Sequence, residues 1–567
     1  TTSSDNSMEA LTQLRKIANK QCFISGMTGI VTDIKNIAMK ELPIYVVIAA
    51  LLSLVVLEIT SGSFVVPFLF LLSIGLAILY NLGSNIILGE TSYITQALTA
   101  VLQLGVTMDY SIFLLESYEA NKERYEGDKK RAMAHAISNT FTSITASSIT
   151  TVAGFVALCF MTFKLGTNIG IVMSKGVVIG VLTCVTVLPA MILTCDKAIE
   201  KTTHRSLIPS LDKLSHGIVK GRYVALLLFL IVLVPAIHGN NNYKIYYNID
   251  QSLPKNIPSN EANEKLKKEF NMSNMHMILL KDGLSAKEKS AMSKEIEKVD
   301  GVKWVIGLNS LVGSNVPESM IPNDIKKMLK TDNYELEFVS SDYSSATDEV
   351  NSQLAKIDKI VKKYQNDGMV IGEAPMMKDL QDVTDVDLKT VNNISILAIF
   401  VIILITFKSI SIPVILISVI EFAIACNMAV PFYTNTSLPF VASIVIGTIQ
   451  LGATVDYAIL MTSRYHKERT ERGQSKKDAI RIAHETSIKS ILTSGLCFFA
   501  ATFGVSVYSQ VDMIGSICTL LSRGAIISMI VVICVLPAML WIFDGVIKRT
   551  SWNMIKANVA KRDAEKK

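Results

Sequence analysis

Eleven long apolar runs constrain what this sequence of 567 residues can fold into. Most are long enough to cross a hydrocarbon core of about 30 Å as a helix. Because a backbone in lipid has no water to satisfy its amides, and the alternating pattern of a barrel is absent, we expect every run to be helical. The predicted spans cover residues 44–59, 64–82, 92–117, 143–163, 169–195, 222–238, 391–407, 411–432, 438–463, 488–508 and 514–543. The expected fold class is a membrane all-α helical bundle.

The composition supports a membrane protein. Half of the residues are apolar and 18% are charged, whereas about a quarter are charged in an average soluble chain. The formal net charge is +6, but no basic stripe alternates with aromatic residues, so we expect basic membrane loops and no nucleic-acid partner. The eight cysteines form no CxxC pair, which argues against a disulfide framework and against a thiolate metal site.

The loops between the spans predict an orientation. Residues 464–489 contain eight Lys or Arg and residues 196–222 contain six, so the positive-inside rule places these segments in the cytoplasm. The resulting domain boundaries are a first-repeat bundle at 44–196, a cytoplasmic linker at 197–221, a span at 222–238, an external domain at 239–390, a second-repeat bundle at 391–543 and a basic cytoplasmic tail at 544–567.

The external segment 239–390 has the pattern of an α+β domain. Strands are expected at 276–280, 302–308, 334–340 and 369–372, and helices at 285–299 and 346–364. This βαββαβ order is typical of the split-βαβ arrangement, in which two helices cover one face of a four-stranded sheet. Residues 309–333, which include Pro317 and Pro322, are predicted to be an irregular insertion with a short helix.

The sequence contains an internal repeat at an offset of 346 to 348 residues. LGVTMDYSIFL at 104–114 matches LGATVDYAILM at 451–461, VLPAM at 187–191 matches 535–539, and SKG at 174–176 matches SRG at 522–524. Duplicated helix bundles are common among secondary transporters, whose substrate or ion sites lie between the repeats. The repeat therefore predicts a pseudo-twofold bundle with a site between its halves.

The repeat also extends to the first residues. Residues 1–43 resemble 345–389, with a helix after residues 3–5 and an apolar strand expected at 22–26. On this pattern residues 1–43 are the C-terminal remnant of a first external domain. The expectation that follows is a chain lacking its N-terminal part, with roughly 690 residues and twelve spans in the complete architecture.

Two acidic residues lie inside predicted spans, and each is followed by a tyrosine. An Asp at a helix centre costs about 2.5–3.5 kcal/mol on insertion scales, so Asp109 and Asp456 at repeat-equivalent positions require a reason. Desolvation penalises the ionised form, which suits a carboxyl group that binds and releases a proton. Gly105 and Gly452, four residues earlier on the same helix face, predict a close helix approach at which Asp and Tyr meet. A structural hydrogen bond between helices is the alternative.

Other polar residues inside the spans are secondary candidates. For the cations, snorkelling to the headgroups and a role as countercharges are both open, and Arg523 is a hypothetical partner of Glu421. The Ser/Thr-rich segment 142–151 is expected to bond its own carbonyl groups. The secondary candidates are Glu421, Asn427, Gln103, Gln450, Lys175 and Arg523.

The repeated GxxxDY motif, SITASSITTVAGFVAL at 143–158 and the two LPAM segments carry a family resemblance. They resemble the mycobacterial-membrane-protein-large (MMPL) branch of the resistance-nodulation-division superfamily. The resemblance implies a proton relay formed by Asp109, Tyr110, Asp456 and Tyr457, with Gly105 and Gly452 permitting the contact. It also implies external porter domains and lipidic or hydrophobic cargo, whereas Glu421 lies outside the general motif.

The expected function is export of lipids or hydrophobic small molecules across a bacterial cell membrane, driven by the proton motive force. Protons are the coupling ion, and we expect no other cofactor, no metal and no enzymatic activity; a monomer and a trimer are both open. One alternative is an intramembrane aspartyl protease, which needs two carboxyl groups sharing a proton, although its two motifs usually differ and here they are duplicates. A sterol-sensing or Sec-associated member of the superfamily is another alternative.

Overall fold

The chain folds into two compact units in a computed structural model. The structure describes residues 4–18, 22–24, 26–125, 128–204, 211–249, 252–254, 256–270, 274–308 and 323–554. One unit, here called the domain unit, comprises Thr1–Asn36 and Tyr246–Val386. The other, the bundle unit, comprises Ile37–Ile245 and Asp387–Lys567. Most of the expected insertion at 309–333, part of the linker at 197–221 and residues 555–567 of the expected tail lie outside the described residues.

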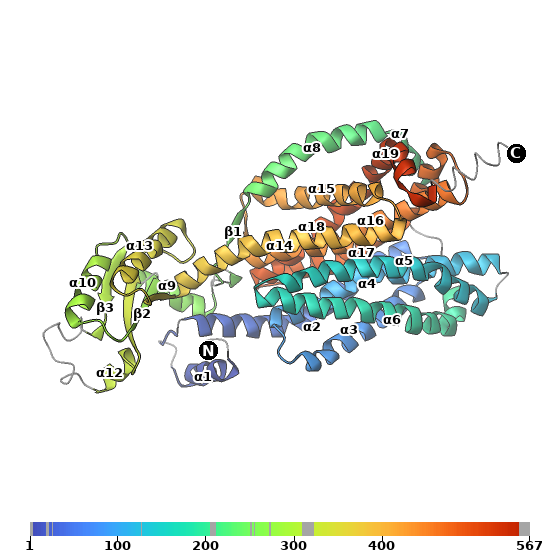
Figure 1. Cartoon of the computed structure of the whole chain (residues 1–567). Coiled ribbons are helices and arrows are strands. Elements are labelled where there is room, and N and C mark those ends of the chain that lie inside the picture. Colours follow the sequence, from blue (N-terminus) through green and yellow to red (C-terminus); the bar gives the residue numbers. More distant parts are fainter. Residues whose placement is uncertain are drawn as a thin grey trace. The chain divides into compact units, whose positions relative to one another are not determined.

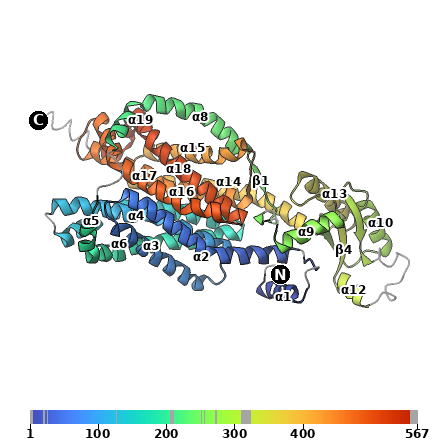
Figure 2. The same cartoon turned by 180° about the vertical axis from the view of Figure 1, so that it is seen from behind.

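In the described part of the chain, eleven helices are long and apolar enough to cross a membrane, which equals the number of apolar runs in the sequence. They form a bundle of roughly parallel rods in Figure 1, and Figure 2 shows the same bundle from behind. The helices are α2 (Met27–Thr60), α3 (Val65–Gly83), α4 (Tyr93–Arg124), α5 (Lys129–Ala157), α6 (Lys164–Lys201), α8 (Arg222–Asn242), α14 (Glu373–Phe407), α15 (Ser411–Tyr433), α16 (Phe440–Thr470), α17 (Lys476–Tyr508) and α18 (Asp512–Cys534).

Shorter elements connect these helices. The 3₁₀ segments η1 (Ser84–Leu88) and η2 (Leu158–Phe160) follow α3 and α5. Helix α7 (Asp212–Lys220) precedes α8, and α19 (Leu536–Thr550) follows α18. Strands β1 (Lys244–Tyr246) and β6 (Ser437–Pro439) pair in a two-stranded sheet.

The helices that carry the GxxxDY motifs form the centre of the bundle. In their most apolar 18-residue windows, 94% of the α4 residues and 89% of the α16 residues are buried, against 17% for α8. Helix α4 packs against α3, α5, α6 and α17, and α16 packs against α5, α15, α17 and α18. A polar group on α4 or α16 is therefore surrounded by protein, whereas most of α8 presents apolar side chains to its surroundings.

The last predicted span, 514–543, is wrong as a single helix. Helix α18 ends at Cys534, and α19 begins at Leu536 with Pro537 in its first turn. A proline is tolerated there because the N–H groups of a first turn have no partner within the helix. The repeat-equivalent Pro189 lies instead within the unbroken helix α6.

The domain unit contains a four-stranded antiparallel sheet of order β3-β4-β2-β5. Its strands are β2 (Asn274–Lys281), β3 (Val302–Ile306), β4 (Tyr334–Ser341) and β5 (Met369–Gly372), and helices α10 (Ala286–Ile296) and α13 (Asp348–Tyr364) complete the order βαββαβ. A core that includes Ile278, Met292 and Ile357 joins both helices to the sheet. Helices α9 (Pro258–Glu269) and α12 (Asn323–Leu329) flank these elements in the sequence.

The first residues of the chain pack within the domain unit. Helix α1 (Asp5–Ile17) is tied to the start of α2 by Arg15, whose guanidinium donates to both carboxylate oxygens of Asp33 at 2.5 and 3.0 Å. Asp33 also accepts a hydrogen bond from the Ser259 amide in α9. The strand expected at 22–26 is wrong for the described residues 22–24, which have no strand structure, and Ser25 lies outside the described residues. Gly26 has a φ of +112°, a conformation that favours glycine and leads directly into α2.

Candidate functional site

Helices α4 and α16 place the two Asp-Tyr pairs in the interior of the bundle. Asp109 is 3% exposed and Asp456 is 2% exposed, and the neighbouring Tyr110 and Tyr457 are equally buried. Each pair lies in an unbroken helix whose backbone groups are already bonded within the helix. The side-chain carboxyl groups therefore depend on neighbouring helices for hydrogen-bond partners.

Those partners come from the opposite repeat. The Ser494 hydroxyl of α17 donates a hydrogen bond to Asp109 Oδ1. The Thr150 and Thr151 hydroxyls of α5 lie 3.4 and 3.3 Å from Asp456 Oδ1 and Oδ2, respectively. Because α5 belongs to the first repeat and α17 to the second, each carboxyl group links its own repeat to the other. Hydroxyls of the Ser/Thr-rich segment also bond carbonyl groups of their own helix, as expected.

The two tyrosines also interact across the repeats. Tyr110 is close enough to Asp456 for an electrostatic interaction, and Tyr457 is close enough to Asp109. Among the described residues, no hydrogen bond joins either tyrosine hydroxyl to an aspartate. These four buried residues are here called the Asp-Tyr cluster, and hydroxyls of α5 and α17 bind its two carboxyl groups.

The glycines of the two motifs contact different helices from those expected. A Cβ on Gly105 would lie 2.3 Å from Cδ2 of Phe498 in α17, so glycine is needed at this position. Gly452 faces Thr151 and Gly154 of α5, where an added Cβ would have ordinary contacts at 3.5 to 3.6 Å. The glycines therefore allow close approach of α4 to α17 and of α16 to α5. They do not bring α4 and α16 together, as the sequence had suggested.

A second set of polar residues makes equivalent hydrogen bonds in the two repeats. Gln103 accepts a hydrogen bond from Asn81 at 2.8 Å and donates to the Gly176 carbonyl at 3.0 Å. In the second repeat, Gln450 accepts from Asn427 at 2.8 Å and donates to the Gly524 carbonyl at 3.5 Å. These amide pairs join three helices in each half. Asn81 was not among the candidates predicted from the sequence, although it precedes Asn427 by 346 residues.

The two cations inside the spans bind next to these amides. Lys175 donates to the Asn81 carbonyl and to Asn85 Oδ1, and Arg523 donates to Oδ1 and the carbonyl of Asn427 at 2.7 and 2.9 Å. Within the described part of the chain, neither cation forms a salt bridge with a carboxylate. The hypothetical pair of Glu421 and Arg523 is therefore wrong. Glu421 Oε1 is buried without a hydrogen-bond partner among the described residues.

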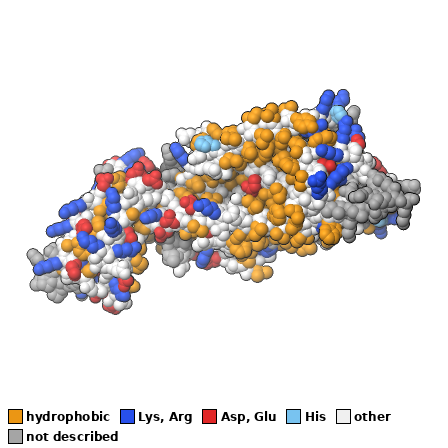
Figure 3. Space-filling model, turned by 45° about the horizontal axis from the view of Figure 1, so that its top comes forward, with side chains coloured by type: hydrophobic (Ala, Val, Ile, Leu, Met, Phe, Trp, Pro, Cys, Tyr) orange, Lys and Arg blue, Asp and Glu red, His pale blue; other side chains and the backbone are white. Residues whose placement is uncertain are grey.

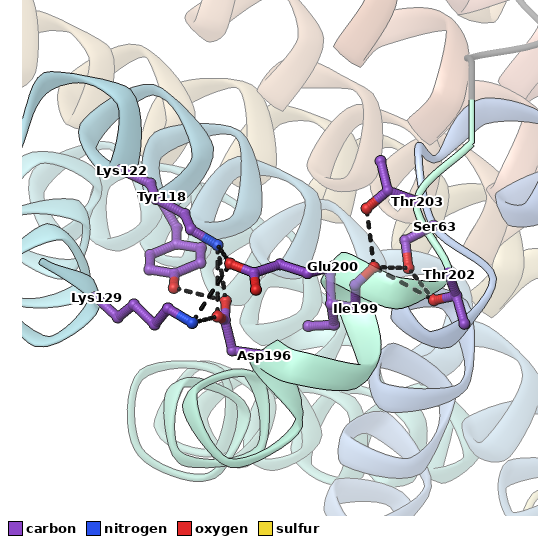
Figure 4. Close-up of polar contacts among 9 residues, drawn as sticks. All are labelled: Ser63, Tyr118, Lys122, Lys129, Asp196, Ile199, Glu200, Thr202 and Thr203. Atoms are coloured by element: carbon purple, nitrogen blue, oxygen red, sulfur yellow. Dashed lines mark hydrogen bonds and ion pairs between the residues drawn. The ribbon is translucent and has the colours of Figure 1, made fainter. Parts of the chain in front are cut away.

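A charged cluster at one end of the first repeat was not predicted (Figure 4). Asp196 on α6 accepts a hydrogen bond from the Tyr118 hydroxyl at 3.0 Å and pairs with Lys122 at 3.1 Å and with Lys129. Glu200 pairs with the same two lysines at 2.8 and 3.3 Å. In Figure 4 the lysines converge on the carboxylates, whereas the Thr202 and Thr203 hydroxyls point to the Ser63 and Ile199 region.

The second repeat has a simpler version of this cluster. Asp544 accepts hydrogen bonds from the Tyr465 hydroxyl at 2.5 Å and from Arg469 at 3.0 and 3.1 Å. Tyr-x-x-x-Lys at 118–122 and Tyr-x-x-x-Arg at 465–469 are 347 residues apart, and the two aspartates are 348 apart. The repeat offset could thus have identified these residues from the sequence.

An apolar groove lies on the flank of the bundle. It has a volume of about 560 Å³ and is lined by residues of α7, α8, α15 and α18 that include Leu228, Phe229, Phe422 and Ile530. Figure 3 shows that hydrophobic side chains dominate the visible flank of the bundle, whereas Lys and Arg gather at one of its ends. The groove can accommodate an apolar chain or a small hydrophobic molecule.

Comparison with known proteins identifies several relatives. The membrane protein ActII-3 of Streptomyces coelicolor is 22% identical over 497 residues, which cover 84% of this chain and 65% of ActII-3. The apo-petrobactin exporter of Bacillus anthracis is 23% identical over 532 residues, covering 85% of this chain and 67% of that protein. The siderophore exporter MmpL5 of Mycobacterium tuberculosis is 21% identical over 322 residues, covering 53% of this chain and 33% of MmpL5.

The chain therefore spans about two thirds of ActII-3 and of the apo-petrobactin exporter and a smaller share of MmpL5. The model of the MMPL family matches residues 1–208 and 251–563, which include both GxxxDY motifs, both helix bundles and the sheet of the domain unit. The chain belongs to the MMPL family.

Proposed function

We propose that this chain drives proton-coupled export of lipidic or hydrophobic small molecules, and that Asp109 and Asp456 bind and release the coupling protons. The observation that carries the proposal is the pair of buried carboxyl groups, each hydrogen-bonded to a helix of the opposite repeat. A buried carboxyl group without a cationic partner is costly when ionised and is a common proton carrier in membrane transporters.

The geometry suggests how proton binding changes the packing of the bundle. An ionised Asp109 accepts the Ser494 hydroxyl, whereas a protonated carboxyl group presents its own donor and changes that hydrogen bond. An ionised Asp456 likewise accepts the Thr150 and Thr151 hydroxyls, and protonation of Asp456 changes these hydrogen bonds. Proton binding therefore alters the hydrogen bonds between the two repeats. One charge crossing 100 mV supplies about 2.3 kcal/mol, enough to bias two states that differ by a few kcal/mol.

Orientation and cargo complete the proposal. The basic segments around α7 and between α16 and α17 face the cytoplasm, and the sheet of the domain unit is an external porter domain. The apolar groove of α8, α15 and α18 supports hydrophobic cargo, since its walls consist of aliphatic and aromatic side chains. Two relatives are named as siderophore or apo-petrobactin exporters, which makes these compounds candidates alongside lipids.

The enzymatic alternative is less well supported. An aspartyl protease dyad requires two carboxyl groups that share a proton. Among the described residues, Asp109 and Asp456 accept hydrogen bonds from hydroxyl groups of α17 and α5. Several relatives are also named as exporters or transport proteins, not as enzymes. No observation in the described residues favours a sterol sensor or a Sec-associated protein over a transporter.

The test is transport in proteoliposomes that carry an imposed proton gradient. The probes are a fluorescent phospholipid analogue and the hydrophobic dye rhodamine 6G. We expect gradient-dependent transport of at least one probe by the wild type, and a loss of at least about tenfold in Asp109→Asn and Asp456→Asn, with normal folding. Glu421→Gln is the matched control, because it removes another intramembrane carboxyl group. Retained transport in both Asn variants would contradict the proposal.

A further inference from the structure

A second pair of buried carboxylates lies outside the Asp-Tyr cluster. Glu41 on α2 and Asp387 on α14 are 346 residues apart, the offset of the repeat, and are 3% and 2% exposed. Both belong to the bundle unit. Each accepts hydrogen bonds from a turn that connects two helices of the opposite repeat.

Asp387 binds the turn between α5 and α6. Both of its carboxylate oxygens lie 3.0 Å from the Thr162 amide nitrogen, and Oδ2 lies 3.2 Å from the Phe163 amide nitrogen. Phe163 is the N-cap of α6 and has no side-chain cap of its own. Asp387 therefore binds the amide groups of the last two residues before α6, one of which is the N-cap residue.

Glu41 binds the equivalent turn between α17 and α18. Its Oε2 accepts hydrogen bonds from the Tyr45 hydroxyl at 2.5 Å and from the Gln510 amide at 3.3 Å. The Tyr45 hydroxyl also lies 2.8 Å from the Ser509 hydroxyl. Gln510 corresponds to Thr162 at an offset of 348. The same connection thus occurs twice, with different side chains.

Both turns lead back to the Asp-Tyr cluster. The turn bound by Asp387 follows α5, whose Thr150 and Thr151 contact Asp456. The turn bound by Glu41 follows α17, whose Ser494 contacts Asp109. A rigid helix transmits a shift along its axis. A change in the hydrogen bonds of Asp456 therefore reaches the turn after α5, and a change in the hydrogen bond of Asp109 reaches the turn after α17.

The helices that carry Glu41 and Asp387 continue into the domain unit. Helix α14 is unbroken from Glu373 to Phe407, and its residues up to Val386 belong to the domain unit. Helix α2 is likewise unbroken from Met27, and its residues up to Asn36 belong to that unit. Each carboxylate therefore lies within a few residues of the point at which its helix passes from one unit to the other.

We propose that Glu41 and Asp387 are positioning residues that couple the Asp-Tyr cluster to the domain unit. They do so by fixing the turns at the ends of α17 and α5 to helices α2 and α14. The proposal rests on the proposed function for its role in transport, but the coupling itself is a structural property that can be measured without cargo. A purely stabilising cap would instead hold the turn and transmit nothing.

Hydrogen exchange of the full chain in lipid nanodiscs tests the coupling. Asp456→Asn imitates the protonated state. We expect it to change the exchange rates of residues 158–163, and also those of residues 373–386 by at least about threefold. In the Asp387→Ala background, the change at 373–386 should disappear whereas the change at 158–163 remains. Asp385→Ala, which removes an exposed carboxylate from the same helix, should leave both changes intact.

Asp387→Asn serves as the conservative variant and covers the case in which Asp387→Ala does not fold. It keeps one acceptor oxygen, so it should retain part of the change at 373–386. For the other repeat, Asp109→Asn should change residues 27–36, and Glu41→Ala should abolish that change whereas Lys40→Ala should not. The proposal is overturned if Asp456→Asn leaves 373–386 unaffected in the wild-type background, or if the change at 373–386 keeps its full size in Asp387→Ala or, where that variant does not fold, in Asp387→Asn. The proteoliposome assay tests the transport proposal, whereas hydrogen exchange tests the coupling proposal. Either proposal can therefore fail without the other.

Discussion

Ser494 and Asp109 belong to different repeats, yet the Ser494 hydroxyl donates a hydrogen bond to the Asp109 carboxylate. The Thr150 and Thr151 hydroxyls of the first repeat likewise donate to the Asp456 carboxylate of the second repeat. The two halves of the bundle are therefore joined by hydrogen bonds to two buried carboxyl groups. Under the proposed function, these hydroxyls would take part in coupling together with the carboxyl groups.

Replacement of Ser494 tests this role. Hydrogen bonds to charged groups contribute about 1.5–3 kcal/mol, so Ser494→Ala should lower the transport rate by about tenfold while the protein stays folded. The measurement is probe transport in proteoliposomes. Ser506→Ala removes a hydroxyl of the same helix that bonds the Phe503 carbonyl of its own helix, and it should leave transport unchanged. Equal rates for Ser494→Ala and the wild type would show that the hydroxyl has no part in coupling.

The two motif glycines should differ in their tolerance of substitution. Gly105→Ala places a methyl group 2.3 Å from the Phe498 ring, and overpacking of this kind costs about 1–3 kcal/mol. Gly452→Ala meets only ordinary contacts and should cost less than about 0.5 kcal/mol. Thermal unfolding in detergent measures both. Gly105→Ala combined with Phe498→Ala should relieve the clash, and equal midpoints for the two glycine variants would contradict the prediction.

The charged clusters at the ends of the two repeats predict that Asp544→Asn and Glu200→Gln destabilise the protein to different extents. Arg469 and Asp544 are 9% and 7% exposed, so Asp544→Asn leaves a buried guanidinium poorly paired and should cost about 3–5 kcal/mol. Glu200 is 51% exposed, so solvent screens its ion pairs and Glu200→Gln should destabilise the protein much less. Unfolding midpoints of the two variants compare these costs. The exchange Arg469→Asp with Asp544→Arg should recover part of the loss if the pair itself is responsible.

Cysteine labelling tests the proposed orientation. Cys22 is an exposed free thiol in the domain unit. A membrane-impermeant maleimide should therefore label it in intact cells, and Cys22→Ser should abolish that signal. Lys477→Cys, at an exposed position in the basic segment, should react only after the membrane is permeabilised. Labelling of Lys477→Cys in intact cells would indicate the opposite orientation.

The sheet of the domain unit should lose stability as the pH rises. Burial raises the pKa of Glu337 to about 7, because ionisation in the core is penalised. The unfolded value is about 4.3, so the contribution of Glu337 to stability is complete below that pH and is lost as the pH rises through 7. The loss is on the order of 3 kcal/mol. Protection factors of the β2 and β4 amides in the full chain measure it.

Glu337→Gln should remove this decline, whereas the exposed Glu349→Gln should keep it. His276 acts in the opposite direction. Burial lowers its pKa, so its contribution is complete above about 6.5 and is lost as the pH falls through the lower folded value. A decline between pH 4.5 and 7 that persists in Glu337→Gln would assign the effect to another group.

The apolar runs and the strand and helix patterns were sufficient to predict much of the secondary structure. The described residues contain eleven helices of membrane-spanning length, and the sheet of the domain unit and its two helices follow the order βαββαβ. These features are local, because the length of an apolar run and the period of a strand are properties of consecutive residues. Asp109 and Asp456 were also visible in the sequence, since a charge within an apolar helix stands out wherever its partners lie.

The partners of those residues depended on the tertiary structure. The repeat aligns Gly105 with Gly452, but it does not show that one faces Phe498 and the other faces Gly154, because helix packing decides which faces meet. For the same reason the sequence paired Arg523 with Glu421, whereas the structure pairs it with Asn427. The sequence alone determined which residues are polar inside the membrane and how they repeat. Only the tertiary structure decided which groups share a hydrogen bond, since that depends on distances of a few ångströms between helices hundreds of residues apart.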